Sequence, residues 1–223
     1  MIIKTLNISK IVVGPGKKSA TILEDISIGL NKGDFLTILG PSGSGKTTLL
    51  QILGLMDTPS SGEMNIFDRD IKSLSLEEKA HLRANEIGFI FQKPFLINDL
   101  TLEENLRLAN KLSKKEASND IIDNILETVG LIDKKLSYPK MLSTGEAQRG
   151  SLARAIINQP VLIIADEPTA SLDRENKLIV LDLLKKFNSE KSVSIILASH
   201  DSLVLEYCKS FLKLKDGKIH IDN

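Results

Sequence analysis

The sequence of 223 residues has one cysteine, no excess of charge and no long apolar run. Cys208 cannot form an internal disulfide, which favours a reducing compartment such as the cytoplasm. Lys plus Arg and Asp plus Glu each total 29, so the zero net charge gives no electrostatic footprint for nucleic acid. The longest apolar runs, at 161–165 and 195–198, fall far short of the ~20 residues of a membrane span. Lys4 interrupts the N-terminal segment, so we expect neither a secretory leader nor a membrane-crossing chain.

The remaining composition is that of a globular protein with a parallel α/β sheet. Apolar residues make up 42% and charged residues 26% of a chain long enough to bury a sizeable core. Apolar runs between helical segments are typical of strands buried on both faces of a parallel sheet. We expect strands at 2–8, 22–30, 35–39, 63–67, 87–91, 161–165 and 193–198, and helices at 46–55, 76–85 and 174–187.

A helical pattern occupies residues 101–158 and interrupts the alternation of strands and helices. Capping boxes at 101–104 and 143–146 each precede an apolar run and predict the starts of two helices. A hairpin with strands at 211–214 and 218–221 is expected to turn at 216–217, where the residues are Asp-Gly.

Residues 40–47 read GPSGSGKT and fit the phosphate-loop pattern G-x-x-x-x-G-K-[ST] between a predicted strand and a predicted helix. Glycines let backbone N–H groups close around phosphates, and the helix N-terminus adds positive potential. Lys46 would reach the β- and γ-phosphates, and the Thr47 hydroxyl is placed for Mg²⁺. A Gly/Ser-rich connection is the alternative, which the flanking strand and helix disfavour. The predicted nucleotide-binding residues are Gly40, Pro41, Ser42, Gly43, Ser44, Gly45, Lys46, Thr47 and Thr48.

Polar side chains follow three predicted strands, and the carboxyl edge of a parallel sheet is where open α/β folds hold ligands. Asp166 would coordinate Mg²⁺ directly or through water, and Glu167 could polarise an attacking water. His200 follows another apolar strand and is expected to face the γ-phosphate. Gln92 could contact Mg²⁺ or the lytic water. A solvated acid and a structural histidine are the alternative interpretations of Glu167 and His200.

These residues, taken in order, resemble the ATP-binding subunit of ABC transporters over essentially the whole chain. The matching motifs are GPSGSGKT at 40–47, Gln92, the signature LSTGE at 142–146, LIIADE at 162–167, the D-loop SLD at 171–173, and His200. The segments 73–92 and 165–173 look most like the branch that contains lipoprotein-releasing and macrolide-efflux ATPases. The cell-division ATPase of the same type is also similar.

The resemblance implies an α/β fold, with a P-loop NTPase core of ABC ATPase type, an antiparallel β subdomain and a helical insertion. The whole chain, 1–223, would form one domain. Within it, 1–91 and 159–223 would form the ATP-binding core with its β subdomain. Residues 92–158 would form the glutamine loop and the helical signature subdomain.

The resemblance also implies a head-to-tail dimer that sandwiches two ATP molecules. Ser143 and Gly145 would start a helix that faces the nucleotide of the second copy, and the D-loop with Asp173 would cross the interface. The membrane-spanning transporter subunit would be another polypeptide, and this chain would be a free-standing subunit on the inner face of the cell membrane. No nucleic-acid partner is expected.

Two features depart from the usual pattern of the family. The signature has Thr144 where glycine is usual, and Glu146 where glutamine is usual. Threonine fits a helical backbone but resists a strained one, and we expect the helical case because Glu146 completes a capping box. The adenine ring usually stacks on an aromatic residue, and Val13 or Val12 stands nearest that position here.

The leading hypothesis is an ATP hydrolase that powers transport or membrane extraction through a membrane partner. A transmembrane signalling ATPase of the cell-division type is the alternative, and a nucleotide-binding scaffold without turnover is a third reading. A DNA-repair ATPase of the same superfamily is excluded, because the stretch between Gln92 and Ser143 is too short for long coiled-coil arms.

Overall fold

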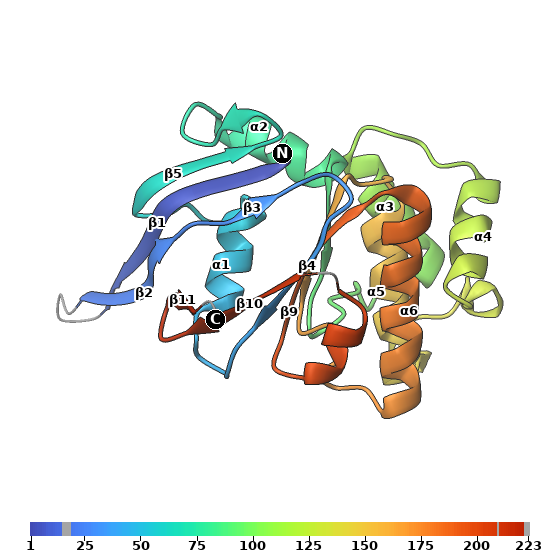
Figure 1. Cartoon of the computed structure of the whole chain (residues 1–223). Helices are drawn as coiled ribbons and strands as arrows, with labels where there is room; N and C mark the ends of the chain where they lie inside the picture. The colour runs from blue at the N-terminus through green and yellow to red at the C-terminus, as the bar shows by residue number, and fades with distance from the viewer. Residues whose placement is uncertain (15–18, 209, 221–223) are drawn as a thin grey trace.

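The computed structural model describes residues 1–14, 19–208 and 210–220, which form two sheets and the helices around them (Figure 1). The larger sheet has the order β11-β10-β4-β9-β8-β7. All neighbouring pairs from β10 to β7 are parallel, and β11 joins the edge antiparallel to β10, so the predicted parallel α/β sheet is confirmed. Its strands are β4 (Phe35–Leu39), β7 (Ile87–Ile90), β8 (Leu162–Asp166), β9 (Ser194–Ser199), β10 (Ser210–Lys215) and β11 (Lys218–His220).

The second sheet is antiparallel, and it contains two strands where the sequence predicts one at 22–30. The sheet contains β1 (Ile3–Val13), β2 (Ser19–Ile26), β3 (Gly29–Leu30), β5 (Ser61–Ile66) and β6 (Arg69–Asp70). Between β2 and β3, the Thr5 hydroxyl donates to the Ile26 carbonyl at 3.2 Å and accepts from the Ile28 N–H at 2.8 Å. The Thr5 hydroxyl takes the place of backbone hydrogen bonds at this point, so β2 ends at Ile26 and the chain pairs with β1 again as β3. The prediction of one continuous strand was therefore wrong.

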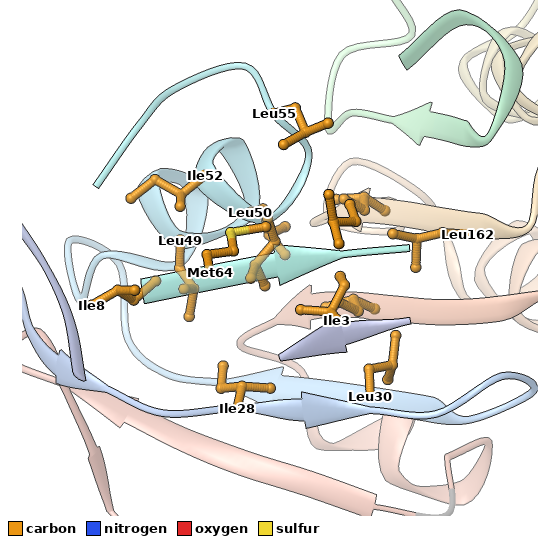
Figure 2. Close-up of a cluster of buried hydrophobic side chains, with 14 of the residues drawn as sticks. Ile3, Ile8, Ile28, Leu30, Leu49, Leu50, Ile52, Leu55, Met64 and Leu162 are labelled. Carbon is orange, nitrogen blue, oxygen red and sulfur yellow. The ribbon is translucent and has the colours of Figure 1, made fainter. Parts of the chain in front are cut away.

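Each central strand buries both faces because alternate residues enter two different apolar clusters. In β8, Leu162 and Ile164 lie in a cluster that includes α1 (Lys46–Leu53) and the antiparallel sheet, whereas Ile163 and Ala165 lie in a cluster with the helices that follow β7. Figure 2 shows Leu162 in the first cluster together with Leu49 of α1. The period of two thus places α1 between the two sheets, and the helices that follow β7 on the far face of the larger sheet.

The helices follow the sequence pattern, with some differences at their ends. They are α1 (Lys46–Leu53), α2 (Leu76–Asn85), α3 (Leu102–Leu112), α4 (Asn119–Thr128), α5 (Thr144–Ile156) and α6 (Arg174–Lys191). Both predicted capping boxes form, and a third, between Ser75 and Glu78, starts α2. The helix predicted to end at 187 continues to Lys191, because no glycine or proline precedes the left-handed C-cap at Ser192.

Short 3₁₀ helices complete the fold, and the C-terminal hairpin turns where it was predicted. The 3₁₀ helices are Ile132–Lys134, Pro139–Met141 and Ser202–Glu206. Asp216 and Gly217 have φ of 49° and 74°, the left-handed pair that a two-residue hairpin turn needs. Residue 221 of the predicted second strand lies outside the described residues.

Asn158, which follows α5, joins the helical region to the core. Its Oδ1 accepts from Asn110 Nδ2 at 2.9 Å and from Ser113 Oγ at 3.2 Å. Its Nδ2 donates to the carbonyls of Ala84 at 2.8 Å and Ala109 at 3.1 Å. Asn110 and Ser113 are buried, so water does not readily replace Asn158 as their partner.

Replacing Asn158 by alanine should destabilise the fold. Each buried polar group left unpaired costs about 1–3 kcal/mol, so we expect the free energy of unfolding to fall by about 2–4 kcal/mol. Urea denaturation of Asn158→Ala measures this loss. Asn65→Ala, at an exposed position of β5, is the control and should change stability little. Equal midpoints for the two variants would contradict a joining role for Asn158.

Candidate functional site

The phosphate loop connects the end of β4 to the start of α1, as the sequence predicts. Gly45, the N-cap of α1, has φ 101°, and Gly43 has φ 79°. At Gly45 any side chain would be strained, and its Cβ would lie 2.9 Å from the Leu23 side chain. The first N–H groups of α1 therefore open into the loop, which is the arrangement that binds phosphate.

The ammonium of Lys46 is held inside this loop. The residue is only 6% exposed, and its Nζ donates to the carbonyls of Gly40 at 2.7 Å and Pro41 at 3.0 Å. Nζ also lies 3.3 Å from Oε1 of Glu167. The cation thus bridges the loop and the acidic end of β8.

The carboxylate of Asp166 faces the loop from β8. Its Oδ2 accepts from Thr47 Oγ1 at 2.8 Å, whereas its Oδ1 is buried without a hydrogen bond to any described residue. Burial raises the pKa of Asp166, and the nearby charge of Glu167 adds to this rise, while the Thr47 bond and Lys46 oppose it. An unpaired buried carboxylate oxygen fits a divalent cation, which would supply the missing positive charge.

A cation at Asp166 would have few protein ligands. Within the described residues, no group of three or more His, Cys, Asp or Glu side chains could hold a metal ion. Thr47, Asp166 and Gln92 are among the oxygen-bearing side chains that line the cavity. This donor set fits Mg²⁺, which keeps several waters and takes substrate phosphates as ligands.

Glu167 and His200 form a pair beside Lys46. Glu167 Oε2 lies 2.8 Å from His200 Nδ1, and the Glu167 N–H donates to the Ala198 carbonyl at 2.9 Å. The backbone of Glu167 is left-handed, with φ 49°, which turns its side chain into the cavity. The sequence placed both residues at one sheet edge but gave no signal of their contact, nor of the contact between Glu167 and Lys46.

One cavity of about 310 Å³ collects the residues predicted from these separate motifs, and this volume lies in the range of small-ligand sites. Ile22, in the middle of β2, also lines it and has no signal in the sequence. The predicted residues that line it are Ser42, Gly43, Gly45, Lys46, Thr47, Thr48, Gln92, Asp166, Glu167 and His200.

Other predicted residues lie outside this cavity. Val13, at the end of β1, is 68% exposed and is not among its lining residues. Ser143 and Gly145 start α5 in the helical layer, and Asp173 caps α6 there. Thr144 is the first residue of α5, so the threonine stands in a helical backbone and the strained alternative does not occur.

Two side chains of α5 donate hydrogen bonds to the backbone around Gln92. Gln148, which is 2% exposed, donates through Nε2 to the Phe91 carbonyl at 2.9 Å. Arg154 donates to the carbonyls of Pro94, at 3.0 Å, and Phe95. Burial lowers the pKa of Arg154 from its ordinary value. The glutamine loop is therefore positioned by the same helix that begins with the signature.

Among the described residues, none of the helices combines the length and apolar character that a membrane crossing needs.

Comparisons with known proteins agree with this geometry. The ABC transporter family matches residues 23–170. The chain is 41% identical to the lipoprotein-releasing system ATP-binding protein LolD of Buchnera aphidicola, over 98% of this chain and 96% of that protein. It is 42% identical to the macrolide export ATP-binding/permease protein MacB of Campylobacter jejuni, over 90% of this chain and 32% of that protein.

A solved structure is similar along the whole chain. It is the dimer of the ATP-binding cassette MJ0796 in a post-hydrolysis state, bound to ADP and Pi. The TM-score is 0.91 at 32% identity, over 99% of this chain and 97% of that one. With the phosphate loop, the acidic strand end and the histidine around one cavity, these findings show that the chain belongs to the ABC transporter family, as an ATP-binding and ATP-hydrolysing subunit.

Proposed function

We propose that two copies of this chain close around two ATP molecules with Mg²⁺, and that hydrolysis drives an integral-membrane partner encoded separately. The observation that carries the proposal is the meeting of Lys46, Asp166, Glu167 and His200 around one cavity at the carboxyl edge of the parallel sheet. The proposed unit is one domain, 1–223, with its core in 1–91 and 159–223 and its helical signature subdomain in 92–158.

Each side chain has a role that its contacts support. Lys46 moves from the carbonyls of Gly40 and Pro41 to the β- and γ-phosphates. Thr47, Asp166 and Gln92 would hold Mg²⁺, which would neutralise phosphate charge. Glu167, released from Lys46, accepts the proton of the attacking water.

His200 orients Glu167, because its Nδ1 lies 2.8 Å from the carboxylate that must face the water. Lys46 and Glu167 separate as the nucleotide enters, whereas His200 stays with Glu167, so the chemistry depends on occupation of the loop.

The position of the signature in the fold supports the proposal of a dimer. Ser143 and Gly145, with Asp173 near them in space, stand outside the chain's own cavity, so they would face the nucleotide of a second copy. The similar structure of MJ0796 is a dimer bound to ADP and Pi, which is consistent with this arrangement. Val13 remains our proposal for the position beside the adenine ring.

A membrane partner would dock beside the glutamine loop. An open groove of about 500 Å³ there is lined by Phe95, Met56, Gln92, Thr47 and Asp166. Phe95 and Met56, 63% and 44% exposed, give this groove an apolar rim that a membrane partner would cover. The chain would then sit on the cytoplasmic face of the membrane. MacB is named as both an ATP-binding protein and a permease, and this chain spans about a third of it.

Lys46→Ala should abolish useful ATP binding. Two charge-assisted hydrogen bonds at about 1.5–3 kcal/mol each predict an affinity at least about a hundredfold weaker. Isothermal titration with ATP and Mg²⁺ measures it, and Lys32→Ala, at an exposed position far from the loop, is the matched control. A Lys46→Ala protein that binds ATP normally would refute the phosphate-loop assignment.

Glu167→Gln should keep ATP binding but reduce turnover by about 10²–10⁴-fold, because the amide cannot accept the proton of the water. Size-exclusion chromatography with ATP should then show an accumulated dimer, since hydrolysis no longer opens it. Glu63→Gln, exposed on β5, should behave as the parent protein does. Full activity of Glu167→Gln would assign the proton transfer to another group.

Thr144→Gly should change ATPase activity by less than about tenfold, because Thr144 is exposed and already has a helical backbone. Ser143→Arg should block dimer closure by filling the space before α5. Both are measured with the membrane partner present. A large gain in turnover for Thr144→Gly would mean that the threonine impairs the signature.

A further inference from the structure

Gly145 of the signature helix packs directly against Asn176 of α6. A Cβ built at Gly145 would lie 2.2 Å from Oδ1, 2.4 Å from Cγ and 2.9 Å from Nδ2 of Asn176. All three distances are well below van der Waals contact, so alanine at 145 requires Asn176 to move. The contact lies within one chain and involves no nucleotide.

Asn176 is held at both ends of its amide and cannot move without losing hydrogen bonds. Its Nδ2 donates to both carboxylate oxygens of Asp173, at 3.1 and 3.0 Å. Its Oδ1 accepts from Arg149 Nη1 at 2.8 Å, and Arg149 Nε donates to the Val129 carbonyl at 3.1 Å. The amide thus connects the D-loop, through Asp173, to the signature helix, through Arg149.

Asp173 is fixed by the same residue. The Asn176 N–H donates to its Oδ1 at 2.9 Å and caps α6. This backbone bond, with the side-chain amide, holds the pKa of Asp173 below its usual value. Asp173 is therefore an anchored carboxylate at the start of α6.

We infer that Asn176 is a positioning residue that sets the separation between the signature helix and the D-loop, and that position 145 is glycine because Asn176 occupies the space of a side chain. The inference rests on the proposed function, in which both segments face the second copy. Asn176 does not line the ATP cavity, so losing it should weaken dimer closure without weakening ATP binding by one chain.

The competing explanation is that glycine is needed at 145 so that the backbone can approach the nucleotide of the partner. The two explanations differ in a double variant. Alanine at 176 removes all three atoms that a methyl group at 145 would meet. Asn176→Ala can therefore restore the dimerisation of Gly145→Ala only if the methyl group at 145 is obstructed by Asn176 and not by the nucleotide of the partner.

The experiment uses the full chain carrying Glu167→Gln, and measures by analytical ultracentrifugation the ATP concentration at which half of the protein is dimeric. Gly145→Ala should raise this concentration by about tenfold or more, and Asn176→Ala by about threefold. The double variant should return to within about threefold of Asn176→Ala alone. Asn65→Ala, on β5, is the matched control and should not shift it. A double variant as impaired as Gly145→Ala, or more so, overturns the inference.

A second variant, Asn176→Asp, keeps the shape beside Gly145 and the acceptor for Arg149, but it loses both donations to Asp173 and faces it with a like charge. It should impair dimerisation while the affinity of the monomer for ATP stays within about twofold of the parent. Unchanged dimerisation overturns the positioning role. If the parent itself forms no ATP-dependent dimer, the proposed function fails and this inference falls with it. If the parent dimerises and the double variant is not rescued, the inference alone fails.

Discussion

Parallel pairing of β4, β9 and β8 is the constraint on which the rest of the molecule depends. The register sets Leu39 beside Ser199 and Asp166 beside Ala198, so the carboxyl ends of the three strands reach the same level. The phosphate loop, the acidic pair and the histidine leave the sheet at these ends. Because these strands are apolar on both faces, they need cover on both sides, which α1 and the helical layer provide.

Helix α5 is the second organising element, because it begins with the signature and holds two loops that act at different places. Gln148 and Arg154 fasten the glutamine loop beside the chain's own cavity. Arg149, through Asn176, reaches the D-loop. A rotation of the helical layer would carry the signature and both loops together, so the groove proposed for the membrane partner and the surface proposed for the second copy are mechanically linked through one helix.

The sequence predicted the features that local chemistry determines. The phosphate loop, the predicted capping boxes and the Asp-Gly hairpin turn each depend on a few neighbouring residues. The division between β2 and β3 could not be predicted, because it depends on Thr5, more than twenty positions away. The same holds for the contact of Glu167 with His200 and for that of Asn176 with Gly145, since each joins segments that only the fold brings together.

The left-handed backbone of Glu167 places stability and activity in opposition at a single position. The left-handed conformation costs a residue such as glutamate about 1–2 kcal/mol, whereas glycine and asparagine adopt it more readily. Such a substitution would remove the carboxylate that faces the cavity. Selection for a robust fold alone would not choose glutamate here, so thermostabilising design of this subunit would meet a trade-off at residue 167 and should leave it unchanged.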